Sequence, residues 1–370
     1  MPQLERIDLS NNELTAWPKG IEKCIQLKSL SLEGNQLEAV PSAILEQLQQ
    51  LEVLDLSSTG LSKLPAAITQ LPQLKRLYLS RNQFKKFPKG ICTITSLQRL
   101  DLSYNTLSKI PNNIKNLTEL RNLDLDNTNL KTLTESITTL QQLTTLSLVG
   151  NHLKTLPASI GQLHQLTCLY LTHNKLETLP ASIGDLKALT ALYASKNQLK
   201  TLPANIGQLQ QLTCLFLSEN NLLTLPDHLQ ALEQLEYLEL SDNQLESLPP
   251  SIATLKKLET LNLSSNQFKT FPSNILGLKN LEYLYMGRNQ LETLPDAIDQ
   301  LKGLHEIELY KNRISTLPRS IRRLSRLDGI VLSDNPIYEN QAQLEKWSEE
   351  WGIELWGYDT MLREIGCSCW

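Results

Sequence analysis

The 370-residue sequence has no apolar run near the ~18 residues that a membrane-spanning helix needs. Its first residues lack the charged stretch and apolar core of a secretory signal peptide. The 35 basic and 39 acidic residues nearly balance, so no strong positive field favours nucleic acid or an anionic membrane. These absences predict a soluble, cytoplasmic protein that binds neither membrane nor nucleic acid.

Motifs that mark common catalytic centres are also missing. The sequence contains no G-x-x-x-x-G-K-[ST], no G-x-G-x-x-G after a strand, no H-E-x-x-H and no G-x-S-x-G. The five histidines are scattered, and the pair Cys367 and Cys369 has no nearby histidine or further cysteine to complete a metal site. We therefore predict a protein that is not an enzyme and that holds no metal and no cofactor.

The dominant feature of the chain is a repeat of 23 residues, which runs from Leu4 to Asn335. Its unit reads L-x-x-L-x-L-x-x-N-x-L-x-x-L-P-x-x-I-x-x-L-x-x and occurs fifteen times, with Thr59 and Thr128 in place of the asparagine. One interval is a residue longer, with the insertion near Ile44 to Glu46. Such self-similarity predicts a solenoid whose stacked units share one core, rather than separate globular domains.

Each unit has a pattern that predicts its local structure. In Cys168–Leu171, alternation sends Leu169 and Leu171 inward and leaves the other two side chains on the open face. A buried asparagine at the ninth position can bond to backbone groups that the turn leaves unpaired. The proline then ends the extended segment, and one or two helical turns follow on the opposite side. Glycines 161, 184 and 207 recur there, where tight curvature suits them.

The two ends of the solenoid differ. We predict the solenoid over residues 1–338 and a C-terminal cap over 339–370. In the cap, Asn340 and Gln343 resemble a helix-capping pair, and Gly352 is placed to end the helix. Ile353–Trp356 then reads as a last strand, followed by a short tail. Nothing precedes the first unit to cover it, so either that unit is frayed or the chain is part of a longer protein.

The cysteines are predicted to be free thiols. Cys168 and Cys214 occupy the same place in units separated by one other, so they should lie nearly ~10 Å apart, too far for a disulfide.

Residues on the open face of the strands form two zones. In the N-terminal half, arginines alternate with aspartates; in the C-terminal half, tyrosines and a phenylalanine form a band bordered by glutamates. The candidate protein-binding residues are Arg76, Tyr78, Arg99, Asp101, Arg121 and Asp124 in the first zone, and Tyr170, Tyr193, Phe216, Tyr237, Glu239, Tyr283 and Tyr285 in the second. Tyrosine favours strands, and arginine can pair with aspartate across strands. Grouped aromatic residues on an open face nevertheless favour a binding site. For the charged zone, both interpretations stay open.

The second half of the unit, as in Leu156-Pro157-Ala158-Ser159-Ile160-Gly161-Gln162-Leu163, resembles the leucine-rich repeat family. Within that family it is similar to intracellular Ras-suppressor and scribble-type scaffold proteins and to bacterial members that sometimes precede a Roc GTPase module. The resemblance implies an α/β solenoid of horseshoe form, with a parallel sheet on the concave side and short helical turns on the convex side. Thr134, in place of proline, and Ala194, in place of a core leucine, depart from the pattern. Ala194 should leave a local gap.

The resemblance also implies protein recognition on the concave face without catalysis. We therefore expect a non-enzymatic scaffold in intracellular signalling that binds a protein partner, such as a small GTPase or a signalling enzyme. The alternative is a regulatory sensor arm that controls a GTPase or kinase module in a partner or in a longer parent chain.

Overall fold

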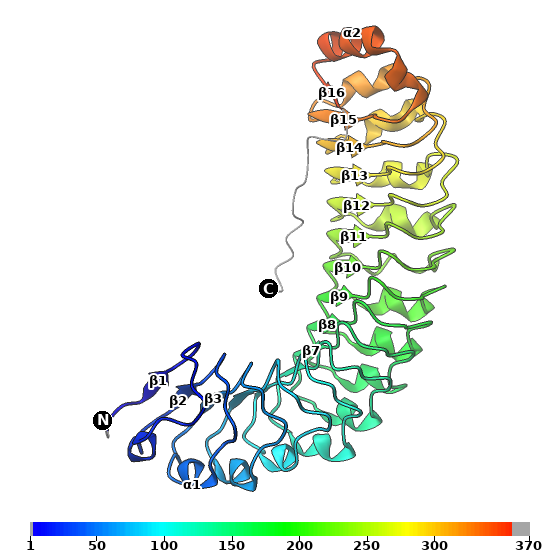
Figure 1. The fold of residues 1–370 in the computed structure, drawn as a ribbon. Coiled ribbons are helices and arrows are strands. Elements are labelled where there is room, and N and C mark those ends of the chain that lie inside the picture. Colours follow the sequence, from blue (N-terminus) through cyan, green and yellow to red (C-terminus); the bar gives the residue numbers. More distant parts are fainter. Residues whose placement is uncertain (1–2, 357–370) are drawn as a thin grey trace. The chain divides into compact units, whose positions relative to one another are not determined.

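A computed structural model of the protein describes residues 3–356, which form two compact units (Figure 1). Unit 1 lies within Met1–Leu176 and unit 2 within Glu177–Trp370. Each unit is a stack of repeats with one short parallel strand per repeat, as predicted. The separate prediction of a boundary at residue 338 stays a prediction.

The strands of each unit lie in chain order. In unit 1 they are β1 Arg6–Asp8, β2 Ser29–Ser31, β3 Val53–Asp55, β4 Arg76–Tyr78, β5 Arg99–Asp101, β6 Asn122–Asp124, β7 Thr145–Ser147 and β8 Cys168–Tyr170. In unit 2 they are β9 Ala191–Tyr193, β10 Cys214–Phe216, β11 Tyr237–Glu239, β12 Thr260–Asn262, β13 Tyr283–Tyr285, β14 Glu306–Glu308, β15 Gly329–Val331 and β16 Glu354–Trp356. Equivalent residues of neighbouring repeats pair directly, so the register follows the sequence repeat.

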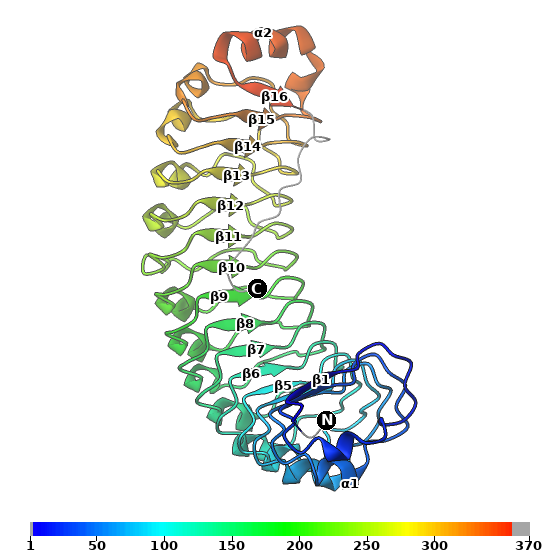
Figure 2. The same cartoon turned by 90° about the vertical axis from the view of Figure 1, so that its left-hand side faces the viewer.

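The segments on the convex side are mostly 3₁₀ turns. In unit 1 these are η1 Ile21–Lys23, η2 Ala66–Gln70, η3 Ile91–Thr93, η4 Asn112–Asn116, η5 Glu135–Thr139 and η6 Ile160–Gln162. In unit 2 they are η7 Ala181–Asp185, η8 Ala204–Gln208, η9 Pro250–Thr254, η10 Ser273–Gly277, η11 Asp296–Gln300, η12 Arg319–Arg323 and η13 Pro336–Glu339. The longer repeat instead forms a short α-helix, α1 Ser42–Leu45, since its extra residue allows an i→i+4 bond. Figure 2 shows these turns across the repeats from the strands.

The core of each unit consists of the consensus leucines and isoleucines. Leu169, Leu171, Ile160 and Leu163 are all fully buried, as the pattern predicts. At Gly184 a side chain would collide with the backbone oxygen of Asn205 in the next turn. The recurrent glycine therefore permits close packing of neighbouring turns, and no left-handed backbone conformation requires it.

The ninth-position asparagine is a buried link between repeats, as predicted. The Nδ2 group of Asn220 donates to the carbonyl of Leu217 in its own repeat (3.0 Å) and to that of Ala194 in the preceding one (3.0 Å). Its Oδ1 accepts from the N–H of Leu199 (3.0 Å). Thr128 is a weaker link, because its single hydroxyl hydrogen can serve either Leu125 O (2.7 Å) or Asn151 Oδ1 (3.0 Å), but not both at once.

The two departures from the consensus are both accommodated. Thr134, where the pattern has proline, precedes η5 and accepts a hydrogen bond from the N–H of Ser136 (3.3 Å). Ala194 is fully buried, and its backbone keeps the ladder bond from its N–H to Phe216 O (2.8 Å). The gap expected beside Ala194 stays a prediction.

The ends of the described chain follow the sequence signals. At the start, Leu4 is 43% exposed, whereas the equivalent Leu27 and Leu51 are fully buried. At the other end, helix α2 Gln341–Trp351 begins with Asn340 accepting from the N–H of Gln343 (3.2 Å) and ends at Gly352 in the left-handed conformation. Strand β16 then pairs with β15. The rest of the predicted cap lies outside the described residues.

The prediction of free thiols is correct in part. Cys24, Cys92 and Cys168 are buried and form no disulfide. Cys214 is disulfide-bonded, so the prediction is wrong for this residue. The spacing argument had excluded only one pairing, with Cys168, and that pair is indeed not bonded. Cys367 and Cys369 lie outside the described residues.

Within residues 3–356, no helix is long and apolar enough to cross a membrane, and no group of His, Cys, Asp and Glu side chains could hold a metal ion.

We predict that Asn220→Ala destabilises the fold by roughly 2–4 kcal/mol, because it leaves several buried backbone groups without a partner. Asn221→Ala is the matched control, since the neighbouring asparagine is exposed. Guanidinium unfolding followed by circular dichroism measures both. Equal midpoints for the two variants would show that the buried asparagine contributes little.

Candidate functional site

The open face of each sheet presents two side chains from every strand, those of its first and third residues. In unit 2 the third residues of β9 and β10 are Tyr193 and Phe216, whose rings stack with centroids 4.9 Å apart and planes 10° from parallel. On β11 the aromatic residue moves to the first place, Tyr237, which pairs with Cys214 of β10. All three aromatic side chains are partly exposed. These three strands therefore form one aromatic cluster, which we call the first aromatic cluster.

The predicted aromatic band is interrupted at β12. Its two open-face residues are Thr260 and Asn262, which pair with Tyr283 and Tyr285 of β13. Tyr283 also stacks on His305, with ring centroids 6.5 Å apart. The band predicted for unit 2 is thus two clusters separated by one polar strand. Tyr170 is the third residue of β8 in unit 1.

The glutamates beside these clusters are partly or fully buried. Glu239 accepts from Asn262 Nδ2 (2.9 Å) and from the N–H of Ser241 (2.8 Å), while burial raises the pKa of its carboxyl. Burial, and secondarily the nearby Glu306, raise the pKa of Glu308 to about 7. A basic group brought to β14 would favour the ionised form of Glu308. The face of unit 2 therefore combines aromatic rings with carboxylates that gain from a cationic partner.

In the described part of unit 1, the arginines of the charged zone form no close ion pair with its aspartates. Arg76 and Arg99 are exposed and directly paired on β4 and β5, which places like charges opposite each other. The guanidinium of Arg99 lies 5.5 Å from the centre of the Tyr78 ring. Among the described residues, no ion pair joins Arg76, Arg99 or Arg121 to an aspartate. Close cross-strand Arg–Asp ion pairs are therefore missing from the described part of this zone, although the charge of Arg99 acts to lower the pKa of Asp124.

The aspartates of this zone instead accept hydrogen bonds from the turns that follow their strands. Asp101 accepts from the N–H of Ser103 (2.9 Å), and Asp124 from the N–H of Asp126 (3.0 Å). Burial first, and then the neighbouring Asp126 and Asp101, raise the pKa of Asp124 to about 7. Each of these carboxylates therefore supports the turn that follows its strand.

Sequence reasoning overlooked one acidic row. Glu236, Glu259 and Glu282 each precede a strand of unit 2 and line a hollow of about 400 Å³. Burial, together with Glu236 and Glu282, raises the pKa of Glu259. The recurrence of glutamate at one repeat position in three successive units could have revealed this row.

Comparisons with known proteins agree with this architecture. The model of the leucine-rich repeat region matches residues 4–124, 107–177, 170–239 and 223–330. No curated protein matches the chain. A solved leucine-rich repeat protein of Leptospira interrogans is 34% identical, with a TM-score of 0.87 over 96% of each chain. An internalin of Listeria monocytogenes is 27% identical, with a TM-score of 0.72 over 84% of this chain and 88% of its own.

A plant receptor gives a third comparison. The ectodomain of the receptor kinase GASSHO1/SCHENGEN3 of Arabidopsis thaliana is 32% identical, with a TM-score of 0.73, and matches 90% of this chain but 44% of its own. The resemblance to Ras-suppressor and scribble-type proteins stays a prediction. Because the family model spans nearly every repeat, the chain belongs to the leucine-rich repeat family.

Proposed function

We propose that the protein is a non-enzymatic scaffold that binds a protein or peptide partner on the concave face of its repeats. The first aromatic cluster, Tyr193, Phe216 and Tyr237, is the observation that carries this proposal. Three large rings on adjacent strands of an open face provide apolar contact area at a small entropic cost. Tyrosine and other aromatic residues are enriched among the side chains that dominate binding energy.

The second aromatic pair and its carboxylates extend this surface within unit 2. Tyr283 and Tyr285 lie beside Glu306 and Glu308 of β14. A partner segment that places a lysine or arginine over β14 and apolar side chains over β9–β11 would match both features. Among similar proteins, the plant receptor ectodomain was solved in complex with CASPARIAN STRIP INTEGRITY FACTOR 2, which supports binding as the general role of the fold.

The charged zone of unit 1 supports the same function. Arg76 and Arg99 face solvent side by side as like charges, which costs folding stability. Asp124 adds a second cost, since burial and two neighbouring carboxylates disfavour its charge. Such unfavourable pairs are typical of surfaces that bind a partner at the expense of stability.

The finer predictions concern the identity of the partner, the pathway and the location in the cell. A small GTPase or signalling enzyme as the partner, a role in signalling and a cytoplasmic location stay predictions from the sequence. The same holds for the alternative of a sensor arm that controls a GTPase or kinase module.

We predict that Tyr193→Ala, Phe216→Ala and Tyr237→Ala together abolish capture of the partner, because hot-spot rings contribute about 2 kcal/mol or more each. Affinity capture from the native source with mass spectrometry identifies the partner, and calorimetry with the purified partner gives the change in Kd. Tyr104→Ala with Leu223→Ala is the control, since it removes exposed apolar side chains away from the sheet face. Undiminished capture by a well-folded triple variant would rule out the aromatic cluster as the binding site.

We also predict that Asp124→Asn stabilises the protein at pH 8 by roughly 1–3 kcal/mol and has little effect near pH 3.5. The folded pKa of Asp124, about 7, exceeds the ordinary value of 3.8, so the folded state binds the proton more tightly. The stabilising contribution of this group is therefore complete below the ordinary pKa and is lost as the pH rises toward 7. Asparagine removes the loss and can still accept from the N–H of Asp126.

Urea unfolding across this pH range measures the effect. Asp55→Asn is the matched control, because Asp55 stands at the same repeat position and accepts from the N–H of Ser57. Ser57 takes the place of Asp126 and has no carboxylate that could repel Asp55. A pH dependence that is the same in Asp124→Asn as in the wild type would contradict the prediction.

A further inference from the structure

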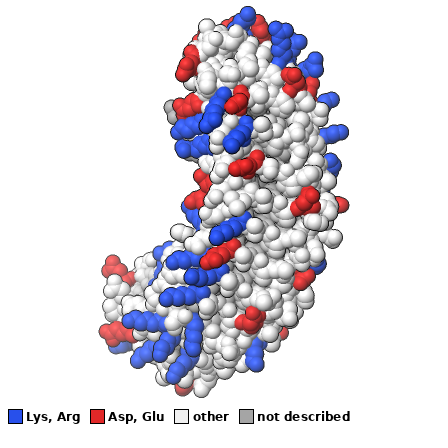
Figure 3. Space-filling model, turned by 90° about the vertical axis from the view of Figure 1, so that its right-hand side faces the viewer, with Lys and Arg blue, Asp and Glu red and all other residues white. Residues whose placement is uncertain are grey.

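A second surface of unit 1 lies away from the sheet face, where each chain segment runs from the buried asparagine toward the helical turn. In residues 59–66, 82–90 and 105–112 this flank carries five lysines and no aspartate or glutamate. We call it the lysine flank; its members are Lys63, Lys85, Lys86, Lys89 and Lys109. All five are exposed, and Figure 3 shows Lys and Arg side chains gathered on the lower part of the molecule.

The charge of the lysine flank is not neutralised within the described chain. Among the described residues, no ion pair involves any of the five lysines. Lys131 and Lys154 continue the row in the next two repeats; the segment of Lys154 has no acidic residue, and that of Lys131 has one, Glu135, at its end. Several like charges held on successive repeats create a local positive field, although the whole chain has a net charge of −4.

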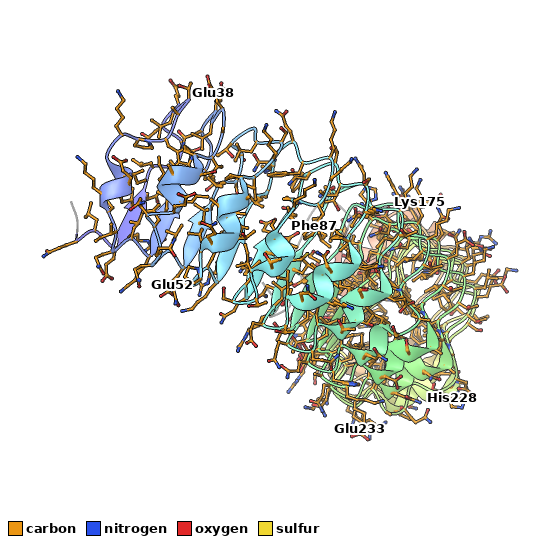
Figure 4. The ribbon with its side chains drawn as sticks, turned by 90° about the horizontal axis from the view of Figure 1, so that it is seen from below. Glu38, Glu52, Phe87, Lys175, His228 and Glu233 are labelled. Atoms are coloured by element: carbon orange, nitrogen blue, oxygen red, sulfur yellow. The ribbon has the colours of Figure 1, made fainter. Side chains whose placement is uncertain are left out.

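Between these lysines lies a groove of about 580 Å³ with an apolar floor. Leu64, Phe87 and Pro111 line it together with the fully buried Phe84. Phe87, labelled in Figure 4, takes the place of the leucine that precedes the repeat's proline and is only half-buried. Lys63, Lys86, Lys89 and Lys109 stand around this floor.

We propose that this groove binds an acidic peptide segment of a partner protein, with one large apolar side chain of the segment seated between Leu64 and Phe87. The lysine rim complements carboxylates on both sides of that side chain, and the floor removes its apolar surface from water. The volume lies in the range of sites that enclose a small ligand or an anchoring side chain.

The shape of the groove selects this occupant over other anionic surfaces. A membrane surface is bound by aromatic residues that protrude into the lipid, whereas Phe84 is buried and Phe87 half-buried in a hollow. A nucleic acid backbone would use the lysines but would leave the apolar floor unfilled. The lysine flank is separate from the concave face, so this inference does not depend on the proposed function.

Fluorescence polarisation with fluorescein-labelled nine-residue peptides tests the inference. Each peptide has four glutamates on either side of a central Phe, Leu, Met, Trp or Gly. We expect saturable binding of at least one peptide with an apolar centre, at least fivefold weaker binding of the Gly peptide, and weakening as NaCl is raised. Absence of saturable binding by every apolar-centred peptide, or equal binding of the Gly peptide, overturns the proposal.

Charge-reversal variants of the full chain locate the site. Lys63→Glu, Lys86→Glu and Lys109→Glu together should weaken binding at least tenfold. Lys200→Glu, Lys269→Glu and Lys302→Glu form the matched control, because they change the net charge equally from exposed positions in the repeats of unit 2. The control should change binding less than twofold. Equal losses in both variants, or binding of phosphatidylserine vesicles in place of the peptides, overturn the proposal.

Discussion

The buried asparagine ladder is the constraint on which the rest of each unit depends. The carbonyl of Leu217 accepts from Asn220 in its own repeat and from Asn243 in the next, both at 3.0 Å. One side chain therefore satisfies backbone groups in two repeats at once, and any other spacing would leave them buried and unpaired. This requirement holds every strand in register with its neighbours. It explains why a single extra residue is absorbed on the convex side, as α1, and not in a strand.

A scaffold held in this way leaves a few positions in each repeat unconstrained. The first and third residues of each strand face away from the core, and the segment after the asparagine contributes only its apolar residues to the stack. Unit 2 uses the strand positions for rings and carboxylates, as in Tyr193, Phe216 and Glu239. Unit 1 uses them for arginines and aspartates, and it uses the later segment for lysines. Recognition can thus vary from repeat to repeat while the core stays the same.

The sequence was sufficient to predict the strands and the buried asparagines, because these depend on contacts between equivalent positions. It also predicted both caps of helix α2, which depend on local hydrogen bonds. It was not sufficient where a backbone N–H group and an arginine side chain could both bind the same carboxylate. Arginines near Asp101 and Asp124 suggested ion pairs, yet the turn N–H groups bind those carboxylates. Cys214 is a similar case, because spacing excludes one partner but cannot identify the actual one. The groove beside Phe87 was overlooked because only strand positions were compared between repeats.

The proposed binding surfaces differ from ordinary polar faces, because each contains a carboxylate whose charge is disfavoured. An aspartate that only closes a turn could remain fully solvated, whereas burial raises the pKa of Asp124 to about 7. The same holds for Glu308, also with a pKa of about 7. A carboxylate in this state changes charge near neutral pH when a cation approaches or withdraws. Each sheet face therefore contains a group whose ionisation would respond to a bound cation. The fold tolerates this cost because the asparagine ladder and the leucine core hold the strands independently.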